Sequence, residues 1–527
     1  MSGRPPNDLL ASSLRELRGA TEQGARSVLK SDLLSRVHRE RLAKAGFVEE
    51  IMRGWLAVNS RPSDRRRIDS EWSTVYWEFV RSYLDDRFGS DWCFSPETSV
   101  TLWAENWSVA PQIVVRSPAA NNQVLPMPGG TSLYLLRVPQ PDQSVVHNGV
   151  RVLTKEEAII NSAKNSWTAI PTDMIAVMGS IRGSASLLRV LLSGARSTMA
   201  GRIAGALRHL GRIRDADSIL STMSAAGYVV HEDDPFDDSG HALLDERRAA
   251  TPAATRIKNL WAKMSRDALD SIDIEGTRFN DIDAYMEEIE ERYVADALNS
   301  LSIEGYQVSE ELIEWVQSGT WNPEEHAGDA DARNALAAKG YRLAYEEVRK
   351  DIRSILEGEP SGPLLSHRHQ DWFREMFRPS VQAGIIEAYK LAGYRSHNVY
   401  LRGSSHVPLP PHAIADAMDA LFECIEDESD PRAKAIVAPF LFTYIHPFPD
   451  GNGRSGRFLM NALLAEAGLP WTVVPVDQRD RYMSCLEEAS QNENIRPLAL
   501  FIEELAKAPP PPPRPQTTAW ASKKYEI

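Results

Sequence analysis

The spacing of apolar side chains divides the chain into a mixed first part and an almost wholly helical second part. Short runs rich in β-branched and aromatic residues, bounded by Pro, Gly and Asn, predict strands at residues 100–103, 112–115, 132–138 and 149–153. Thr154 and Glu157 then form a capping box that predicts a helix start. Apolar residues recur at helical spacing up to about Tyr228 and again from residue 255 onward. The pattern predicts an α+β region followed by a helical one.

The N-terminal residues predict a small unit of helices and a hairpin. Residues 31–45 favour two short helices, the second stopped at Gly46, and residues 47–58 favour two strands around Gly54. Helix, helix and hairpin is the layout of a winged helix-turn-helix. The stretch LLSRVHRERLAKAGFVEEIMRGWLAV resembles the N-terminal part of antitoxins of the type IV abortive-infection kind, and the α+β region resembles their central part more loosely.

The charge distribution restricts any nucleic-acid contact to the N-terminal end. The whole chain has a formal net charge of −14, whereas residues 1–67 carry 14 Lys and Arg against 8 Asp and Glu. The side chains expected to reach DNA phosphates are Arg36, Arg39, Arg41, Arg65, Arg66 and Arg67. A winged domain used for protein contacts is an equally good interpretation, because fold does not fix function.

Other simple classes are disfavoured by composition. No run of about 18 uncharged apolar residues occurs, so a membrane span is not expected, and residues 1–19 lack the apolar core of a secretory signal. A cytoplasmic location is the expectation. The three cysteines are too scattered for a metal or redox site and are expected to be buried. The acidic run at 231–238 with His241, and the pair His367 and His369, are interpreted as solvated turns rather than metal sites.

The richest chemistry lies in residues 446–457, which read HPFPDGNGRSGR. They combine an imidazole, a carboxylate, a Gly-Asn-Gly turn and two guanidinium groups. Apolar residues at helical spacing precede this loop up to Tyr444 and follow it from Phe458, so the turn is expected at a helix N-terminus. Backbone N–H groups and the positive end of the helix favour a diphosphate there.

These residues match, at every defining position, the signature H-x-F-x-[DE]-G-N-G-R-x-x-R of Fic-domain proteins. Most members of that family transfer AMP from ATP to a hydroxyl side chain of a target protein. The resemblance covers roughly residues 285–505 and includes residues 393–399 and 478–482. It implies an all-α core with a small β-hairpin flap.

The chemistry of the loop and the resemblance give its residues the same roles. His446 is expected to be the general base that takes the proton from a Ser, Thr or Tyr hydroxyl. Asp450 is expected to hold Mg²⁺ at the α- and β-phosphates of ATP. Phe448 is expected to pack inward. The residues predicted to bind the nucleotide phosphates are Asp450, Gly451, Asn452, Gly453, Arg454, Ser455, Gly456 and Arg457.

Two further segments complete the predicted site. Residues 398–403 correspond to the flap of the family, an edge hairpin that holds an extended segment of the target by main-chain pairing. The residues assigned to it are Val399, Tyr400, Leu401 and Arg402. Tyr482 is expected against the nucleotide. Where relatives often place an Asn near the adenine or ribose, this chain has Ser490, with Asn492 and Asn494 nearby, so adenine selectivity is less certain than phosphate binding.

Two hexamers before the loop, residues 271–276 and 300–305, repeat the pattern Ser-x-x-x-Glu-Gly. Each is expected to place Ser and Glu one helical turn apart, with Gly ending the helix. In many Fic proteins an inhibitory helix carries [ST]-x-x-x-E-[GN], and its Glu pairs with the second Arg of the signature. The residues that follow favour Ser300, Glu304 and Gly305 for this role, and Glu275 is interpreted as an exposed helix end.

The sequence therefore predicts a multidomain protein. Its parts are a winged helix-turn-helix at 1–68, an α+β antitoxin-like domain at 69–250, a helical region with the inhibitory helix at 251–365, a Fic core at 366–508 and a Pro-rich tail at 509–527. The predicted function is an autoinhibited protein adenylyltransferase that uses ATP and Mg²⁺ on a target protein. Its alternatives are a Fic enzyme of other chemistry (another nucleotide, phosphocholine, or removal of AMP) and a DNA-binding regulator whose Fic part senses nucleotide. No membrane partner is expected, and a homo-oligomer stays open.

Overall fold

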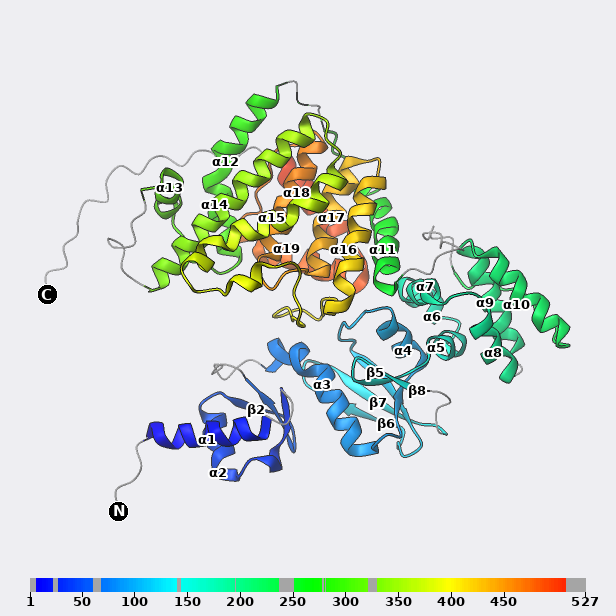
Figure 1. Cartoon of the computed structure of the whole chain (residues 1–527). Coiled ribbons are helices and arrows are strands. Elements are labelled where there is room, and N and C mark those ends of the chain that lie inside the picture. The colour runs from blue at the N-terminus through cyan, green and yellow to red at the C-terminus, as the bar shows by residue number, and fades with distance from the viewer. Residues whose placement is uncertain are drawn as a thin grey trace, which may run out of the picture.

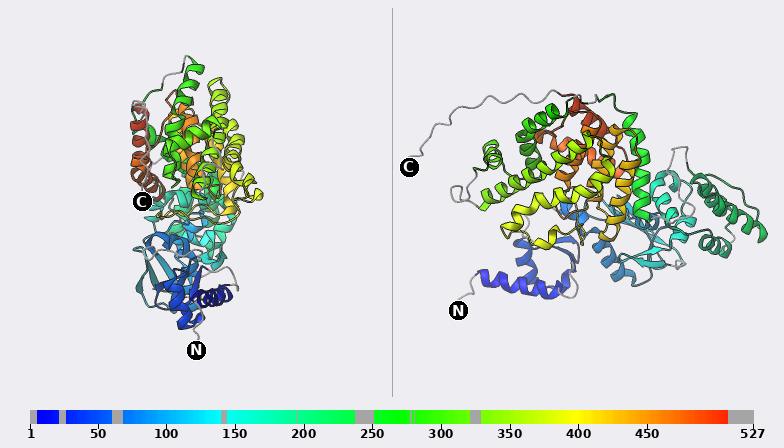
Figure 2. Two further views of the ribbon diagram at one scale, coloured as in Figure 1. Left: turned by 90° about the vertical axis from the view of Figure 1, so that its left-hand side faces the viewer. Right: turned by 45° about the horizontal axis from the view of Figure 1, so that its top comes forward.

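The structure is a computed structural model that describes residues 6–21, 27–59, 68–139, 144–194, 196–236, 251–276, 279, 281–320 and 329–508. The predicted Pro-rich tail, and Asp237, Asp238 and His241 of the acidic run, lie outside these residues. A small N-terminal unit and a sheet-containing region form the base of the molecule, and a large helical body lies above them (Figures 1 and 2). The protein is therefore mostly helical and has small sheets.

The N-terminal unit pairs a hairpin with one further strand. Its elements are α1 (Pro6–Thr21), β1 (Val28–Lys30), a 3-10 turn (Ser31–Leu33), α2 (Arg36–Lys44), β2 (Val48–Met52) and β3 (Trp55–Val58). The antiparallel sheet has the order β1-β3-β2. The hairpin predicted around Gly54 is confirmed. The helix predicted from Ser31 is only a single 3-10 turn, because the backbone is extended at Leu34 and Ser35 before α2 begins. The winged helix-turn-helix assignment stays a prediction.

Three of the arginines expected to contact DNA bond within this unit. Arg39 donates to the Ser31 carbonyl at 3.2 Å, and Arg41 donates to the Leu9 carbonyl at 3.1 Å and the Ser13 hydroxyl at 2.9 Å. Arg36 pairs with Glu40 at 2.8 Å on the surface. Arg65, Arg66 and Arg67 lie outside the described residues. Arg41 in particular holds α2 against α1, so its first role is structural.

The sheet region that follows has one long helix, α3 (Ile68–Phe88), packed on its strands. The helix contributes Tyr76 and Phe79 to the buried core with the strand residues Val115 and Leu133. The other elements are β4 (Cys93–Phe94), α4 (Pro96–Trp103), β5 (Gln112–Ser117), β6 (Gln123–Pro126), β7 (Ser132–Arg137), β8 (Ser144–His147) and β9 (Val150–Leu153). The larger sheet has the order β4-β5-β7-β6, in which β5 and β7 are parallel, and β8 pairs with β9.

Three of the four predicted strands in this region are confirmed, at β5, β7 and β9. The strand predicted at residues 100–103 is wrong, since these residues form the last turn of α4. Ser95 caps that helix by accepting the Thr98 N–H at 3.2 Å, and Pro96 occupies its first turn. These start signals outweigh the strand preference of the β-branched and aromatic residues that follow.

Among residues 155–194 and 196–236 the structure describes six helices, and the helical character predicted up to about Tyr228 is confirmed. They are α5 (Lys155–Asn161), α6 (Ser166–Ala169), α7 (Pro171–Ser180), α8 (Ala185–Ser193), α9 (Ser197–His209) and α10 (Ile213–Ala225). The Thr154 hydroxyl accepts the Glu157 N–H at 3.4 Å, so the predicted cap is confirmed. Among the described helices none alone has the length and apolar composition of a membrane span, although α7 and α8 pass that test together with a bend of 111° between them.

The helical body encloses α18, whose side chains are almost all buried. Its elements are α11 (Pro252–Leu269), α12 (Ile282–Ile303), α13 (Glu310–Ser318), α14 (Asp329–Leu356), α15 (Ser361–Gln382), α16 (Pro411–Asp427), α17 (Pro431–Ile445), α18 (Asn452–Glu466), α19 (Arg479–Asn492) and α20 (Arg496–Lys507). Helices α14, α15 and α17 pack directly on α18 (Figure 1). All three cysteines are free and buried, as predicted.

A buried ion pair joins the α+β region to this body. Arg256 of α11 and Asp173 of α7 are 2% and 4% exposed and are in direct contact. The Arg256 Nε also donates to the Tyr444 hydroxyl at 2.8 Å, in the last turn of α17. Removing one member of such a pair leaves the other charge buried without a counterion. The pair therefore fixes the position of α7 relative to the end of α17.

Truncation of this pair should destabilise the protein strongly. We expect Arg256→Ala to lower the free energy of unfolding by about 3–5 kcal/mol, because buried Asp173 loses its counterion and keeps the weaker hydrogen bond from the Asn106 amide. Urea unfolding followed by circular dichroism measures the loss. The control is Arg36→Ala, which removes a pair exposed on both sides and should change stability by less than about 1 kcal/mol. Equal effects of the two substitutions would contradict the structural role of Arg256.

Candidate active site

The predicted catalytic loop begins with a residue in an unusual backbone conformation. Helix α17 ends at Ile445, and His446 takes φ 56° and ψ 60°, in the left-handed region. For a residue with a Cβ this conformation costs about 1–2 kcal/mol. The His446 N–H still bonds to the Phe442 carbonyl at 3.0 Å, so the chain leaves the helix in one step. The turn requires support from the surrounding residues.

Arg395 supplies that support. Its Nε donates to the His446 carbonyl at 2.8 Å, its other guanidinium nitrogens donate to the carbonyls of His397 and Leu409, and its own N–H donates to the Pro447 carbonyl at 2.9 Å. The side chain is 3% exposed. Burial lowers the pKa of Arg395 to about 10, so it stays charged at neutral pH. Sequence analysis gave Arg395 no role, because its partners are backbone carbonyls from four separate positions.

Asn452 and Phe448 hold the loop in shape through hydrogen bonds to each other and through packing. The Asn452 side chain accepts the Phe448 N–H at 2.9 Å and donates to the Phe448 carbonyl at 2.8 Å. Phe448 is fully buried and stacks on Phe373 at 4.1 Å, so its predicted structural role is confirmed. Because both polar atoms of the Asn452 side chain serve the loop, only its backbone N–H can meet an anion.

The Gly-Asn-Gly turn lies at the N-terminus of α18, as the apolar spacing predicted. Gly451 is the N-cap with φ 81°, and an added Cβ would lie 2.9 Å from the Phe377 ring. The first-turn N–H groups of Asn452, Gly453 and Arg454 have no acceptor within the helix. Deeper in the helix, Ser455 is fully buried and Gly456 packs against Thr443 of α17. The turn thus presents an anion-binding end while the next residues pack the two helices together.

Arg457 is 3% exposed and faces the end of α12. Its Nε donates to the Ser300 hydroxyl at 2.9 Å, and its Nη2 donates to the Ser300 carbonyl at 3.1 Å and to the Glu304 carboxylate at 2.9 Å. A Cβ added to Gly453 would lie 2.4 Å from the same carboxylate oxygen. The Glu304 carboxylate therefore occupies the anion position at the N-terminus of α18.

The Glu304 carboxyl is held ionised in this place. Burial favours its neutral form, but the charges of Arg457 and Arg454 act more strongly together, and the net result is a pKa below the usual value. Its side chain is 26% exposed, so it lies at a boundary between the protein and the cavity. Ionised Glu304 thus balances the buried charge of Arg457.

The two hexamers have different surroundings. Helix α12 ends at Ile303, with Glu304 as C-cap and Gly305 at φ 85°, as predicted. The prediction of a helix end at residues 271–276 is wrong, because α11 already stops at Leu269. Glu275 lies beside Arg432 near the start of α17, far along the chain from the loop.

Asp450 and Arg454 lie on either side of the Gly-Asn-Gly turn in the chain. One Asp450 oxygen accepts the Gly451 N–H at 2.6 Å and lies 3.4 Å from Arg454, while the side chain is 61% exposed. The other oxygen has no partner among the described residues, so it fits the hard oxygen ligand that Mg²⁺ prefers. The Arg454 guanidinium lies over the rings of Tyr306 and Phe377 at 5.4 and 5.1 Å.

A cavity of about 700 Å³ is lined by about half of the predicted site residues, whereas Asp450, Asn452 and Arg454 are not among its lining residues. Its walls include His446, Gly453, Arg457, Glu304, Tyr400, Leu401, Arg402, Tyr482 and Ser490, all named from the sequence. Other lining residues were not predicted, among them His406, Phe440, Thr443 and Glu487, which belong to no motif, and Arg479, which lies in the family-like segment 478–482 but was given no role. Val399 directly precedes the lining residue Tyr400 and does not itself line the cavity. Asn492 and Asn494 bond to Glu488 instead of lining the cavity.

The predicted β-hairpin in the flap is wrong, because residues 383–410 contain no strand. Their backbone turns at Arg402 and Gly403, where the Ser404 N–H bonds to the Leu401 carbonyl at 3.2 Å. The following residues are then bound by α19: Glu487 accepts the Ser404 hydroxyl and the Ser405 N–H. Prolines from position 408 onward lack the N–H groups that a returning strand needs.

The tautomer of His446 follows from its hydrogen bond. Its Nδ1 lies 3.2 Å from the Thr443 carbonyl, which only accepts, so Nδ1 carries the proton and Nε2 is unprotonated. Burial lowers the pKa of His446 to about 4, and the charge of Arg395 acts in the same direction. Near neutral pH the imidazole is therefore a neutral base whose free nitrogen can accept a proton.

Comparison with known proteins agrees with this geometry. Residues 365–464 match the Fic/DOC family. This part of the chain is similar to a Fic domain. A "Probable protein adenylyltransferase" of Aquifex aeolicus is 39% identical over 117 residues, which are 22% of this chain and 34% of the relative. "Protein adenylyltransferase Fic" of Drosophila virilis is 35% identical over 125 residues, 23% of this chain and 25% of the relative. The match thus spans only a third or less of either relative.

Among solved structures, "Fic-1 (aa134 - 508) from C. elegans" is similar with a TM-score of 0.35 and 17% identity, over 67% of this chain and 88% of that one. Within this chain the Fic match runs from the first turns of α15 to the last turn of α18, and so includes Arg395 and the 446–457 loop. Glu304 and Tyr482 lie outside the matched residues.

The titration of His446 tests the Fic site directly. We expect a midpoint near pH 4, because burial disfavours the charged form. Since the unfolded pKa is near 6.5, neutral His446 contributes stability that is full above pH 6.5 and is lost as pH falls toward 4. NMR of protein with isotope-labelled histidine measures it, with His446→Gln to assign the signal. A midpoint above pH 6 would show that the imidazole is not held neutral by its surroundings.

Proposed function

We propose that the protein transfers AMP from ATP to a Ser, Thr or Tyr hydroxyl of a target protein, and that Glu304 holds this activity in check. One observation carries the proposal: the unprotonated Nε2 of His446 and the anion position at Gly453 and Arg457 line the same cavity of about 700 Å³. The names of the two matched relatives, both adenylyltransferases, support the same reaction class.

In this reaction the target hydroxyl oxygen attacks the α-phosphorus of ATP while His446 Nε2 takes the hydroxyl proton. The new O–P bond forms as the bond between the α-phosphorus and pyrophosphate breaks. The N–H groups of Asn452 and Gly453 and the Arg457 guanidinium would bind the phosphate oxygens. Asp450 would hold Mg²⁺, which when bound neutralises charge on the departing pyrophosphate.

Inhibition follows from competition for one position. The Glu304 carboxylate contacts Arg457 at 2.9 Å and lies over Gly453, where a terminal phosphate of ATP would bind. Two anions in one place repel each other and share the same donors. Glu304 therefore opposes productive seating of the nucleotide, whereas Glu275 lies beside Arg432 and has no such contact.

Phosphocholine transfer and nucleotide sensing would each leave some of the predicted site residues without a role. The free oxygen of Asp450 and the anion position at Arg457 favour a substrate with an intact diphosphate over phosphocholine transfer. A regulator that only senses nucleotide would have no need of a neutral imidazole at the attacking position. Tyr482 and Ser490 line the cavity where the nucleoside part would bind. A cytoplasmic location and a homo-oligomer both stay predictions.

Incubation of full-length variants with α-labelled ATP and Mg²⁺ tests the proposal. We expect Glu304→Gly to label itself or lysate proteins at least about tenfold more than wild type, since about 1.4 kcal/mol of relieved competition suffices for that factor. His446→Ala within the Glu304→Gly protein should abolish labelling. Asp450→Ala or chelation of Mg²⁺ should reduce it strongly. Gel autoradiography and mass spectrometry measure the product.

The matched control is Glu275→Gly, which changes the other hexamer. It should behave as wild type, because Glu275 does not contact Arg457. Absence of labelling by Glu304→Gly at any nucleotide concentration would refute the transferase. Activation by Glu275→Gly alone would refute the inhibitory role of Glu304.

DNA binding by the N-terminal unit is a second proposal, based on its excess of basic residues. We expect it to be weak, because Arg39 and Arg41 bond to the unit's own carbonyls. Gel shifts of the full chain on random duplex DNA, repeated at rising salt, measure it. Affinity should fall steeply with salt if phosphates are contacted. No shift even at low salt would exclude this function.

A further inference from the structure

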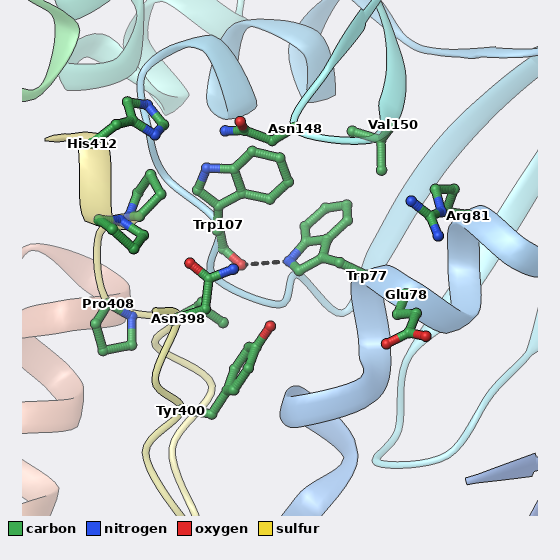
Figure 3. A pocket seen from close by; sticks show the side chains of 13 residues that line it. Trp77, Glu78, Arg81, Trp107, Asn148, Val150, Asn398, Tyr400, Pro408 and His412 are labelled. Carbon is green, nitrogen blue, oxygen red and sulfur yellow. Dashed lines mark hydrogen bonds between the residues drawn. The ribbon is translucent and has the colours of Figure 1, made fainter. Parts of the chain in front are cut away.

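A second cavity, of about 630 Å³, lies beside the flap segment and is lined about equally by the α+β region and by residues 398–412. On one side are Trp77, Glu78 and Arg81 of α3, Trp107, and the turn at Asn148 (Figure 3). On the other side are residues of the Fic domain, namely Asn398, Tyr400, Val407, Pro408, Pro410, Pro411 and His412. The cavity therefore exists only because the two parts of the chain pack together.

Its walls combine aromatic rings with charged and amide side chains, since Glu78, Arg81, Asn148 and Asn398 line it together with Trp77, Trp107 and Tyr400. The Trp77 Nε1 donates to the Trp107 carbonyl at 2.7 Å, and the two indoles meet edge to face at 5.5 Å (Figure 3). Trp107 Nε1 donates to Glu105 at 3.2 Å, and Glu105 also accepts His412 of α16 at 3.1 Å. With their polar atoms bonded to the protein, the indoles offer the cavity apolar ring surface, which suits an apolar or aromatic side chain.

The second cavity adjoins the active site through one residue. Tyr400 lines both cavities and points from the flap segment toward Trp77 and Trp107 (Figure 3). The backbone groups of Asn398, Val399 and Tyr400 make no hydrogen bond with another described residue. Free N–H and C=O groups of this kind can pair with an extended peptide. A peptide lying there would reach from the aromatic walls to His446.

We propose that the second cavity is a specificity pocket for the target polypeptide. It binds a large apolar side chain, Trp, Phe or Leu, that lies a few residues from the modified hydroxyl residue. The target backbone pairs with residues 398–400 between the two positions. This inference rests on the proposed transfer of AMP to a protein, and it narrows the substrates to extended segments that carry both a hydroxyl and a neighbouring apolar residue.

The observations favour a polypeptide over a free small molecule. A small aromatic ligand would use the tryptophans but would leave the unpaired backbone of residues 398–400 without a role. An extended chain uses both features, since its alternate side chains face one side while its backbone pairs along the edge. The three prolines on the Fic side fix the opposite wall at the start of α16.

Binding can be measured without catalysis. The full-length His446→Ala protein is titrated with fluorescent peptides that contain one Ser, Thr or Tyr and either Trp, Phe or Leu at successive flanking positions, or Ala at all of them. We expect the best apolar peptides to bind about tenfold or more tightly than the Ala peptides, as burial of one large side chain allows. Trp77→Leu, and Asn398→Trp which fills the pocket, should each remove this preference.

Two controls separate a lost pocket from a lost fold. Trp315→Leu changes a tryptophan on α13 that is 41% exposed and lies outside both cavities, and it should leave the preference intact. Melting temperatures and ATP binding of Asn398→Trp should match those of the parent. Because Asn398→Trp removes no buried side chain, it tests the pocket even if Trp77→Leu folds poorly.

The outcomes distinguish this inference from the proposed function. Equal binding of apolar and Ala peptides, or a preference that persists in Asn398→Trp, would overturn the pocket. Tight binding of free indole without any peptide preference would also overturn it and indicate a small ligand. If the apolar peptides bind as expected but Glu304→Gly labels none of them with α-labelled ATP, the pocket stands and the transferase proposal fails.

Discussion

One buried charge, the Arg457 guanidinium, sets the arrangement of the site. A guanidinium that is 3% exposed needs a counterion and hydrogen-bond acceptors, because an unpaired buried charge costs several kcal/mol, by a rough estimate. The end of α12 supplies both through Ser300 and Glu304. A terminal phosphate offers the same kind of oxygen acceptors. Under the proposed function, inhibition and nucleotide binding both satisfy the buried charge of Arg457, and the end of α12 would have to withdraw before a terminal phosphate could bind there.

The loop around this charge is stiff. Arg395 donates hydrogen bonds to the carbonyls of His397, Leu409 and His446, and the Asn452 side chain bonds to the N–H and the carbonyl of Phe448. These bonds hold His446 in the left-handed region and fix the face that its Nε2 presents. A base fixed before substrate arrives needs no rearrangement in the reaction, which is how positioning contributes to rate. The contact between Glu304 and Arg457 uses none of these bonds, so its loss would leave the loop in place.

The sequence predicted those parts of the site whose partners are near in sequence or fixed by a signature. The spacing in 446–457 indicated the helix N-terminus, and the hexamer at 300–305 indicated a helix end facing Arg457. The roles of Arg395 and Trp77 could not be predicted, because their partners lie far away in the sequence and no sequence motif identifies either residue. The errors have local causes. Residues 100–103 form a helix instead of a strand because Ser95 caps a helix that begins before them. In the flap, the Ser405 N–H bonds to Glu487 of α19 instead of to a second strand of a hairpin.

The α+β region packs against residues that line the first cavity, although none of its own described residues lines that cavity. Tyr444, two residues before His446, receives the Arg256 hydrogen bond, and His406 stacks on Tyr444 at 4.2 Å while its Nε2 donates to the Tyr444 carbonyl at 2.9 Å. Arg256 is paired with Asp173 of α7, and the Ser405 carbonyl accepts the Val109 N–H at 3.0 Å. A shift of the α+β region would leave buried charges unpaired beside the turn that carries His446. The α+β region and the turn at His446 are therefore held together, which also fixes the position of the cavity at Trp77 relative to His446.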